Sequence, residues 1–334
     1  MNNLYHQKDL RKLSFLVTGG AGFIGNHIAE YLLKNQAQRV RVLDNLATGS
    51  QKNLDILKQY PAFEFIEGDI RNLDTCREAS KNIDYVNHQA ALGSVPRSVK
   101  EPFTTNDVNV SGFVNMLTAA VENKARQFVY ASSSSVYGDD TTLPKKEDRI
   151  GNCLSPYAVS KRANELYADV FSRVYDLPVI GLRYFNIFGP RQNPDGPYAA
   201  VIPLFIRSVI EQKQAHIHGD GEQTRDFTFI ENAVQANIKA MFAPNADAIN
   251  RVYNIAVGET FSVNSVYKKI SEYLKSSLPA IHIKPRAGDV RNSLADISCA
   301  KDLLGYSPEA KFDSGLIKTI EYFKKLYAVQ DVHA

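Results

Sequence analysis

The strongest constraint on the fold of this 334-residue chain is a glycine-rich segment, GGAGFIG, at residues 19–25. A short run of β-branched and aromatic character, Ser14 to Thr18, precedes it, and a pattern of helical period, Phe23 to Lys34, follows at once. Glycines with this spacing permit a tight turn, a close approach of backbone amides to a phosphate group, and close packing of a helix on a sheet. A strand, a glycine turn and a helix in this order are typical of a nucleotide-binding βαβ unit.

The first half of the chain repeats this alternation. The predicted strands are Ser14 to Thr18, Arg39 to Leu43, Phe63 to Glu67, Ile83 to Asn87, Gln127 to Ala131 and Val179 to Arg183. The predicted helices are Phe23 to Lys34, Leu73 to Ser80, Thr105 to Asn123 and Pro156 to Tyr175. We therefore expect an α/β fold with a Rossmann-type, doubly wound parallel sheet.

The alternation breaks after Phe188, in a Gly- and Pro-rich segment, GPRQNPDGPYAA. The elements predicted beyond it are a helix over Ile202 to Glu211, strands at Ala215 to His218 and Arg251 to Ala256, and a closing helix over Ser314 to Leu326. We expect two domains. The larger comprises residues 1–187 with about 226–262, and a smaller α/β domain comprises 188–225 and about 263–330.

Composition excludes several classes of protein. The chain is 44% apolar and 22% charged, which is typical of a globular protein and not of a disordered or coiled-coil one. Its formal charge of +3 gives no reason to expect nucleic acid or an anionic membrane as a partner. No apolar run reaches the ~20 residues of a membrane span. Without a recognisable signal peptide or metal-binding cysteine spacing, we expect a cytoplasmic protein with no metal site.

Asp44 indicates which dinucleotide the glycine turn would hold. It stands at the end of the second predicted strand, 19 residues after Gly25. Dinucleotide sites carry an acid at this point that binds the ribose hydroxyls, and such an acid repels a 2′-phosphate. We therefore expect NAD rather than NADP, with its pyrophosphate at the N-terminus of the first helix.

Further motifs follow the GxxGxxG segment in order, namely GDI at 68–70, HQAA at 88–91, SSSSVYG at 132–138, YAVSK at 157–161, then RYFNIFGPRQ, GDGEQTRDF and RAGDVRNS. This set resembles the extended branch of the short-chain dehydrogenase/reductase superfamily. Within that branch it is similar to the UDP-hexose 4-epimerases, and most to the UDP-N-acetylglucosamine 4-epimerases. The likeness covers nearly the whole chain.

The resemblance implies roles for the matching positions. Ser133, Tyr157 and Lys161 would be catalytic. The residues implied to bind NAD are Gly19, Gly22, Phe23, Ile24, Gly25, Asp44, Asn45, Asp69, Ile70, Ala90, Ala91, Asn109, Tyr157, Lys161 and Tyr184. The residues implied to bind the UDP-sugar are Ser94, Ser133, Ser134, Ser135, Asn186, Val201, Arg225, Arg286, Asp289 and Ser293.

Tyr157 and Lys161 are four residues apart, so a helix places them on one face. A tyrosine has a pKa of about 10, and we expect the neighbouring ammonium to lower it so that the phenolate can act as a base. In the implied reaction, Tyr157 takes the proton of the sugar 4-hydroxyl while the hydride on carbon 4 moves to NAD. The transient 4-keto sugar then presents its other face, and the hydride returns with inverted stereochemistry.

Two positions narrow the reaction and the sugar. Related dehydratases carry an Asp-Glu pair beside the catalytic Ser or Thr, whereas this chain has Ser134 and Ser135 there, so we expect epimerisation. Epimerases confined to plain UDP-hexoses carry a bulky Tyr four residues after the Asp of the RxGD motif. This chain has Ser293 at that position, which leaves room for an N-acetyl group. We therefore predict UDP-GlcNAc and UDP-GalNAc as favoured substrates, with UDP-glucose also accepted.

Two alternatives stay open. An epimerase of UDP-uronic acids (GlcA or GlcNAcA) would need one more cation near the sugar, which Arg97 or Arg191 would supply. A protein of another class, a non-catalytic NAD-binding sensor or scaffold, is disfavoured because the serine, tyrosine and lysine are all present. By analogy with the group we also expect a homodimer, paired through the predicted helices Thr105 to Asn123 and Pro156 to Tyr175.

Overall fold

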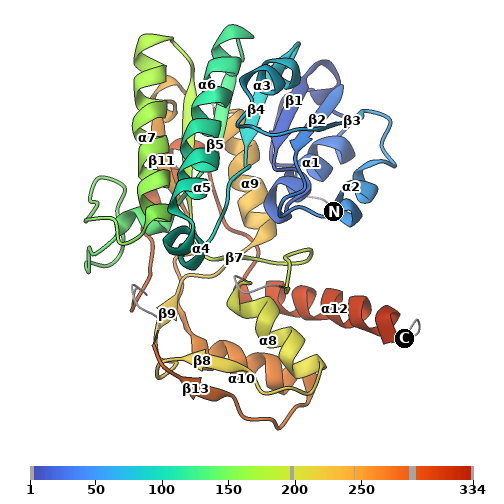
Figure 1. The fold of residues 1–334 in the computed structure, drawn as a ribbon, viewed down its shortest axis with the longest axis vertical. Helices are drawn as coiled ribbons and strands as arrows, with labels where there is room; N and C mark the ends of the chain where they lie inside the picture. The colour runs from blue at the N-terminus through green and yellow to red at the C-terminus, as the bar shows by residue number, and fades with distance from the viewer. Residues whose placement is uncertain (1–3, 196–198, 244, 286–290, 332–334) are drawn as a thin grey trace.

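A seven-stranded sheet forms the centre of the molecule, with the order β11-β6-β5-β4-β1-β2-β3 (Figure 1). The computed structural model describes residues 4–195, 199–243, 245–285 and 291–331. Each neighbouring pair of strands in this sheet runs parallel. The strands are β1 (Ser14–Thr18), β2 (Arg39–Asp44), β3 (Phe63–Glu67), β4 (Tyr85–His88), β5 (Gln127–Ser133), β6 (Val179–Tyr184) and β11 (Arg251–Ile255). The predicted doubly wound, Rossmann-type parallel sheet is therefore confirmed.

Helices cover both faces of this sheet (Figure 1). On one face α1 (Phe23–Lys34) packs beside α9 (Ile230–Met241), and on the other α6 (Gly112–Glu122) packs between α3 (Leu73–Ser80) and α7 (Pro156–Val174). β1 is buried along its whole length because helices shield it from both sides. Strand order reverses between β1 and β4, and in such sheets the crevice at the carboxyl ends of these strands is where ligands bind.

The helical segment before β5 differs from the prediction. Sequence periodicity predicts one helix from Thr105 to Asn123, but the structure has α5 (Pro102–Asn106), a π-helical turn η2 (Asp107–Ser111) and then α6. A π-turn inserts one extra residue into the helical repeat. The apolar periodicity on either side is unchanged, so the pattern of side chains does not reveal the interruption.

A smaller group of elements lies below the carboxyl ends of the main sheet (Figure 1). Its helices are α8 (Val201–Ile210), α10 (Val263–Leu274) and α12 (Phe312–Asp331). Its two-stranded pairs are β8 (His216–His218) with β13 (Ile281–Ile283), β9 (Thr224–Arg225) with β12 (Phe261–Ser262), and β7 (Ile187–Phe188) with β10 (Thr228–Phe229). Phe261 and Phe312 stack in its core with ring centroids 4.1 Å apart. None of the helices in the described ranges combines the length and the apolar character that crossing a bilayer requires.

Candidate active site

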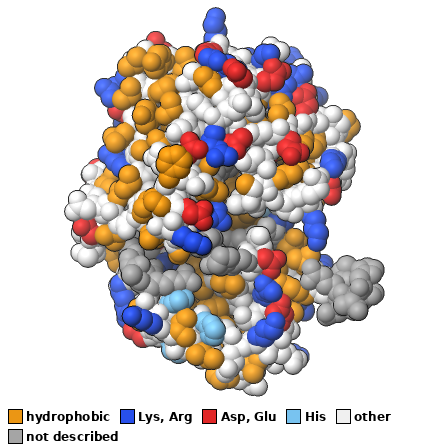
Figure 2. Space-filling model, in the orientation of Figure 1, with side chains coloured by type: hydrophobic (Ala, Val, Ile, Leu, Met, Phe, Trp, Pro, Cys, Tyr) orange, Lys and Arg blue, Asp and Glu red, His pale blue; other side chains and the backbone are white. Residues whose placement is uncertain are grey.

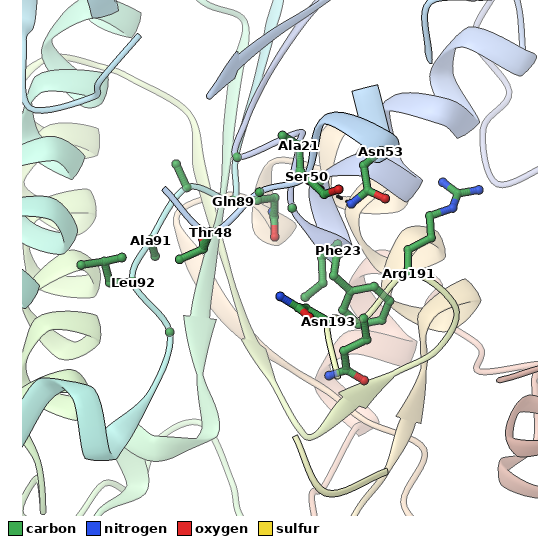
Figure 3. Close-up of a pocket in the computed structure, with 18 of the residues that line it drawn as sticks. Ala21, Phe23, Thr48, Ser50, Asn53, Gln89, Ala91, Leu92, Arg191 and Asn193 are labelled. Carbon is green, nitrogen blue, oxygen red and sulfur yellow. Dashed lines mark hydrogen bonds between the residues drawn. The ribbon is translucent and has the colours of Figure 1, made fainter. Parts of the chain in front are cut away.

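A cleft of about 970 Å³ opens where the carboxyl ends of the strands face the smaller group of elements. Figure 3 shows its walls, with Ala21 and Phe23 on one side, Gln89, Ala91 and Leu92 on the loop after β4, and Asn193 on the loop after β7. The residues from the sequence-based set that line this cleft are Gly19, Gly22, Phe23, Ile24, Gly25, Asp44, Asn45, Asp69, Ile70, Ala90, Ala91, Ser133, Ser134, Tyr157, Lys161, Tyr184 and Asn186. The structure thus brings the glycine turn and the implied catalytic residues to one cavity.

The glycine turn has no room for side chains. Gly19 has a φ of +71°, and a Cβ placed on it would lie 2.7 Å from the backbone nitrogen of Ala90. A Cβ on Gly25 would lie 2.4 Å from the carbonyl oxygen of Gly19. The N-cap of α1 is Gly22, which has no side chain to bond the amides of the first helical turn. Those amides, together with the partial positive charge of the helix end, fit the pyrophosphate of a dinucleotide.

Two carboxylates stand on the wall beside the glycine turn. Asp44 is 9% exposed, and its carboxylate accepts hydrogen bonds from the backbone amides of Ala21 at 2.9 Å and Leu46 at 2.8 Å. Burial raises the pKa of Asp44. Asp69 accepts a hydrogen bond from Asn45 at 2.8 Å, and its pairing with Arg71 lowers its pKa to about 2. These acids are at the positions that the sequence analysis assigns to the adenosine end of NAD.

The implied catalytic residues come from two elements that meet at the cleft. Ser133 is the last residue of β5, whereas Tyr157 and Lys161 lie one turn apart in α7. Ser133, Tyr157 and Lys161 all line the cleft. The Nζ atom of Lys161, a residue only 2% exposed, donates a hydrogen bond to the carbonyl oxygen of Ala131 at 2.8 Å. A serine, a tyrosine and an amine are therefore held together on one wall.

The expected lowering of the Tyr157 pKa is not what the structure shows. Burial raises the pKa of Tyr157, and the neighbouring Ser133 side chain only partly opposes this. Burial also lowers the pKa of Lys161 from 10.5 to about 8. The sequence prediction considered only the attraction between phenolate and ammonium. Removing both groups from water disfavours both charges and outweighs that attraction, while the ammonium is bonded to a carbonyl oxygen.

Asn109 does not line the cleft but supports its wall. It lies in the π-turn η2 and is 1% exposed. Its Oδ1 accepts from the backbone nitrogen of Leu92 at 2.8 Å, and its Nδ2 donates to Leu92 at 3.2 Å and to the hydroxyl of Ser160 at 3.1 Å. Ser160 in turn donates to the carbonyl of Tyr157 at 2.8 Å. The π-turn thus places an amide that ties the loop after β4 to α7 beside Tyr157.

Several residues assigned to substrate binding lie outside the cleft lining. Ser94 caps α4 (Val95–Lys100), since its hydroxyl accepts from the amide of Arg97 at 3.1 Å. The amide of Ser135 donates to the Ser133 hydroxyl at 3.1 Å. Val201 begins α8, directly after the cleft residue Ala200.

Arg225 and Ser293 do not line the cleft, and both are bonded to the carbonyl oxygen of Thr224. The guanidinium of Arg225 donates to the carbonyl oxygens of Thr224 at 2.9 Å and Arg291 at 3.2 Å. The amide of Ser293, which is 8% exposed, donates to Thr224 at 3.1 Å. Arg286 and Asp289 lie outside the described residues. The roles of all these residues stay predictions.

The sequence analysis missed a set of side chains that brace the glycine turn. Asn26 donates to the carbonyls of Gly20 at 3.1 Å and Asn53 at 2.9 Å. Arg191, which appears in the cleft wall in Figure 3, donates to Asn26 at 2.6 Å and to Glu30 at 2.5 Å. An asparagine in the apolar pattern of the first helix is the only local signal for this bracing, and nothing in the pattern links it to residue 191.

Comparison with known proteins assigns the family. Residues 15–256 match the model of the NAD dependent epimerase/dehydratase family. A putative UDP-glucose 4-epimerase of Methanocaldococcus jannaschii is 37% identical over 92% of this chain and 98% of its own length.

Two solved structures are similar over nearly the whole chain. A UDP-N-acetylglucosamine 4-epimerase from Methanobrevibacter ruminantium M1, in complex with UDP-N-acetylmuramic acid, superposes with a TM-score of 0.88 at 37% identity, covering 94% of this chain and 99% of that one. A UDP-glucuronic acid 4-epimerase from Bacillus cereus, with a substrate analogue and NAD, gives 0.88 at 34% identity, covering 94% and 100%. The family resemblance of the motifs is confirmed, and NAD, the predicted cofactor, is the cofactor of the family. This chain belongs to the NAD dependent epimerase/dehydratase family.

Proposed function

We propose that this protein is a UDP-hexose 4-epimerase that interconverts UDP-GlcNAc and UDP-GalNAc with bound NAD. The observation that carries the proposal is the meeting of the glycine turn with Ser133, Tyr157 and Lys161 in one cleft. The stretch around Ser133 contains no carboxylate, since residues 132–135 are all serine. A dehydration needs an acid and a base to eliminate water, and residues 132–135 supply only hydroxyl groups.

The residues of the cleft would divide the work as follows. Gly19, Gly22 and Gly25 would leave space for the pyrophosphate. Asp44 would accept hydrogen bonds from the ribose hydroxyls. Bound NAD supplies the acceptor and donor for the hydrogen at carbon 4 of the sugar. Tyr157 would exchange a proton with the 4-hydroxyl. Ser133, which lines the same cleft, would hold the same oxygen.

Lys161 would favour the ionised form of Tyr157, an attraction that burial outweighs in this structure. In a solvent-poor wall an ammonium favours the phenolate only when it lies close to it. The Lys161 ammonium is one helical turn from Tyr157, and its carbonyl partner, Ala131, lies two residues before Ser133 on β5. The chain therefore keeps a titratable amine beside the proton-transfer pair.

The N-acetyl preference is supported by Ser293 and by the similarity to the Methanobrevibacter enzyme. A small side chain at position 293 would leave space near carbon 2 of the sugar. Among the alternatives, a uronic acid would need an unpaired cation. Arg191 lines the cleft, but its guanidinium is bonded to the Glu30 carboxylate at 2.5 Å, which offsets its charge. This contact disfavours Arg191 as the cation that would bind a uronic acid.

The larger part of the chain, 1–187 with about 226–262, would bind NAD, and 188–225 with about 263–330 would bind the nucleotide sugar. We also propose a homodimer. α7 carries a row of exposed apolar side chains, Val159, Leu166, Val170 and Val174, and Figure 2 shows hydrophobic side chains gathered over this helix at the upper left. A second copy of α7 would cover this row. Sedimentation should give twice the chain mass of 37.2 kDa, and Val170→Glu should reduce it to one chain.

A substrate panel tests the proposed reaction. The purified protein is incubated separately with UDP-GlcNAc, UDP-GalNAc, UDP-glucose and UDP-glucuronic acid, and the products are separated by chromatography. We expect the two N-acetylated sugars to interconvert fastest, UDP-glucose more slowly, and UDP-glucuronic acid least. A 4,6-dehydrated product, or conversion of the uronic acid alone, would contradict the proposal. An NAD-containing protein inactive on every sugar would favour a sensor or scaffold.

A further inference from the structure

Asp226 joins three separate segments of the chain through one carboxylate. It follows Arg225 directly, between β9 and β10, and is 0% exposed. Its Oδ1 accepts a hydrogen bond from the backbone amide of Val257 at 3.0 Å. Its Oδ2 accepts from the amides of Gly258 at 3.0 Å and Ala295 at 3.4 Å. The loop after β11 and the segment before α11 (Ser298–Leu304) are thus fixed to the same side chain.

The chemistry of this position requires a carboxylate. All three partners are N–H donors, so the side chain has to accept on both of its oxygens. A carboxylate does this, whereas an asparagine would turn its own N–H groups toward one of the donors. Burying an ionised acid is costly, and burial raises the pKa of Asp226 to about 6 despite the three hydrogen bonds. The chain retains the charged group at this cost where an uncharged residue would have been cheaper to bury.

The backbone of Asp226 reaches the wall of the cleft. Its carbonyl oxygen accepts a hydrogen bond from Nδ2 of Asn186 at 3.3 Å, and Asn186 lines the cleft. Asn186 has a φ of +36°, a backbone conformation that an asparagine tolerates better than most residues. The amide of Thr228 donates to the Asn186 carbonyl at 3.2 Å. The segment around Asp226 is therefore bonded to Asn186 in both directions.

The same carboxylate holds the segment that carries Ser293. Ala295, one of its three donors, lies two residues after Ser293. The amide of Ser293 is bonded to Thr224, and the guanidinium of Arg225 is bonded to the carbonyl of Arg291. One buried acid thus connects the cleft residue Asn186 with Arg225 and Ser293, two further residues that the sequence analysis assigns to UDP-sugar binding.

We propose that Asp226 is a positioning residue for the UDP-sugar, which sets Arg225 and the 291–295 segment in place relative to Asn186. The inference rests on the proposed function, because it takes Asn186, Arg225 and Ser293 as substrate contacts. Asp226 itself touches neither the cleft nor the proposed reacting atoms. Its loss should weaken substrate binding and leave the NAD site, which is built around the glycine turn between β1 and α1, unchanged.

Steady-state kinetics of the NAD-containing enzyme test this inference. We expect Asp226→Asn to raise KM for UDP-GlcNAc at least tenfold, to change kcat by less than threefold, and to leave the bound NAD per chain as in the wild type. Asp220→Asn is the matched control. The Asp220 carboxylate is 53% exposed and contacts the same segment through Arg291 at 2.7 Å. Because this ion pair is exposed, its loss in Asp220→Asn should alter KM by less than twofold.

The contrary outcomes are separable. The inference would be overturned if KM in Asp226→Asn were unchanged. It would also be overturned if kcat and bound NAD fell together with the rise in KM, because Asp226 would then have a general structural role. A wild-type enzyme inactive on every UDP-sugar would overturn the proposed function, and this inference with it. Asp226→Ser, which keeps one acceptor without amide hydrogens, is measured in parallel in case the asparagine variant does not fold.

A second measurement needs no variant. UDP should slow hydrogen–deuterium exchange in wild-type peptides that contain Gly258 and Ala295, because the substrate would stabilise the segments held by Asp226. Unchanged exchange in both peptides at saturating UDP would overturn the inference.

Discussion

The two sides of the cleft are built in different ways. On one side, the glycine turn comes from one continuous stretch, β1 to α1, and it packs against the backbone of Ala90 in the loop after β4. The other side is assembled from separate segments, with Asn186 after β6, Arg191 after β7, and Tyr322 on α12. Arg225 and Ser293 do not line the cleft, and both are bonded to Thr224 of the short strand β9.

This difference shows that the glycine turn at the centre of the cofactor side can be recognised from local sequence, whereas the substrate side has no such continuous segment. We expect substitutions on the first side to alter NAD binding and proton transfer. Substitutions on the second side should alter the affinity for the sugar nucleotide while NAD stays bound. The following predictions test this division.

The largest effect is expected for Tyr157→Phe. Removal of the phenolic proton should lower kcat by roughly 10³-fold, as is usual for loss of a general acid or base, and bound NAD should remain. Tyr167→Phe, at an exposed position of the same helix, should keep full activity. The test is to measure the turnover of both proteins at saturating UDP-GlcNAc. An active Tyr157→Phe enzyme would exclude the proposed proton transfer.

Lys161→Met should stabilise the NAD-free protein. Because burial lowers the pKa of Lys161 from 10.5 to about 8, holding it charged at pH 7 costs roughly 3 kcal/mol. Between pH 8 and 10.5 the unfolded chain binds more protons than the folded one, so wild-type stability should rise with pH there. Urea unfolding from pH 7 to 10 should show this rise in the wild type and in Lys58→Met, an exposed control, but not in Lys161→Met. Equal slopes in all three proteins would contradict the expected cost.

Gly25→Ala should destabilise the glycine turn. The added Cβ would lie 2.4 Å from the Gly19 carbonyl, and overpacking of this kind costs about 1–3 kcal/mol. We expect a lower melting temperature and less NAD per purified chain. Gly93→Ala is the control, since a Cβ there meets nothing within 4 Å although Gly93 also lines the cleft. Full NAD content in Gly25→Ala would show that the turn tolerates more than its geometry suggests.

On the substrate side, Arg225→Ala should raise KM for UDP-GlcNAc about tenfold, which corresponds to about 1.4 kcal/mol of lost binding. NAD content should not change, because Arg225 lies outside the cleft wall that carries the glycine turn. Kinetics and the absorbance of released NAD give both readings from one preparation. Loss of NAD together with the rise in KM would remove the distinction between the two sides.

The smallest effect is expected for Ser293→Tyr, which should lower the ratio of kcat/KM for UDP-GlcNAc over UDP-glucose about fivefold by filling space near carbon 2. Ser293→Ala, which keeps the side chain small, should leave the ratio unchanged. An unchanged ratio in the tyrosine variant would remove the size argument for N-acetylated sugars.

The contrast between the two sides also explains which elements could be predicted from sequence. β1, β3, α1 and α3 have the predicted bounds, since their apolar residues alternate or repeat with little interruption. α9 was not predicted. Asn232, Gln235 and Asn237 are buried in it beside the apolar residues, so polar residues do not mark an outer face of this helix.

Prediction of the site met the same limit. Motifs identified the residues that line the cofactor side because each lies at the end of a strand or the start of a helix. The bracing of Asn26 by Arg191 joins positions 165 residues apart. The carboxylate of Asp226 finds its partners only after β11 has returned to the sheet. No local pattern encodes such contacts.

The most direct test of the account follows the hydrogen at carbon 4. UDP-GlcNAc deuterated at that carbon is incubated with the protein in ordinary water. The product is isolated, and its molecular mass is measured by mass spectrometry. We predict UDP-GalNAc that retains the deuterium, because the hydrogen stays within the cleft during inversion. Product in which solvent hydrogen has replaced the deuterium would contradict the account.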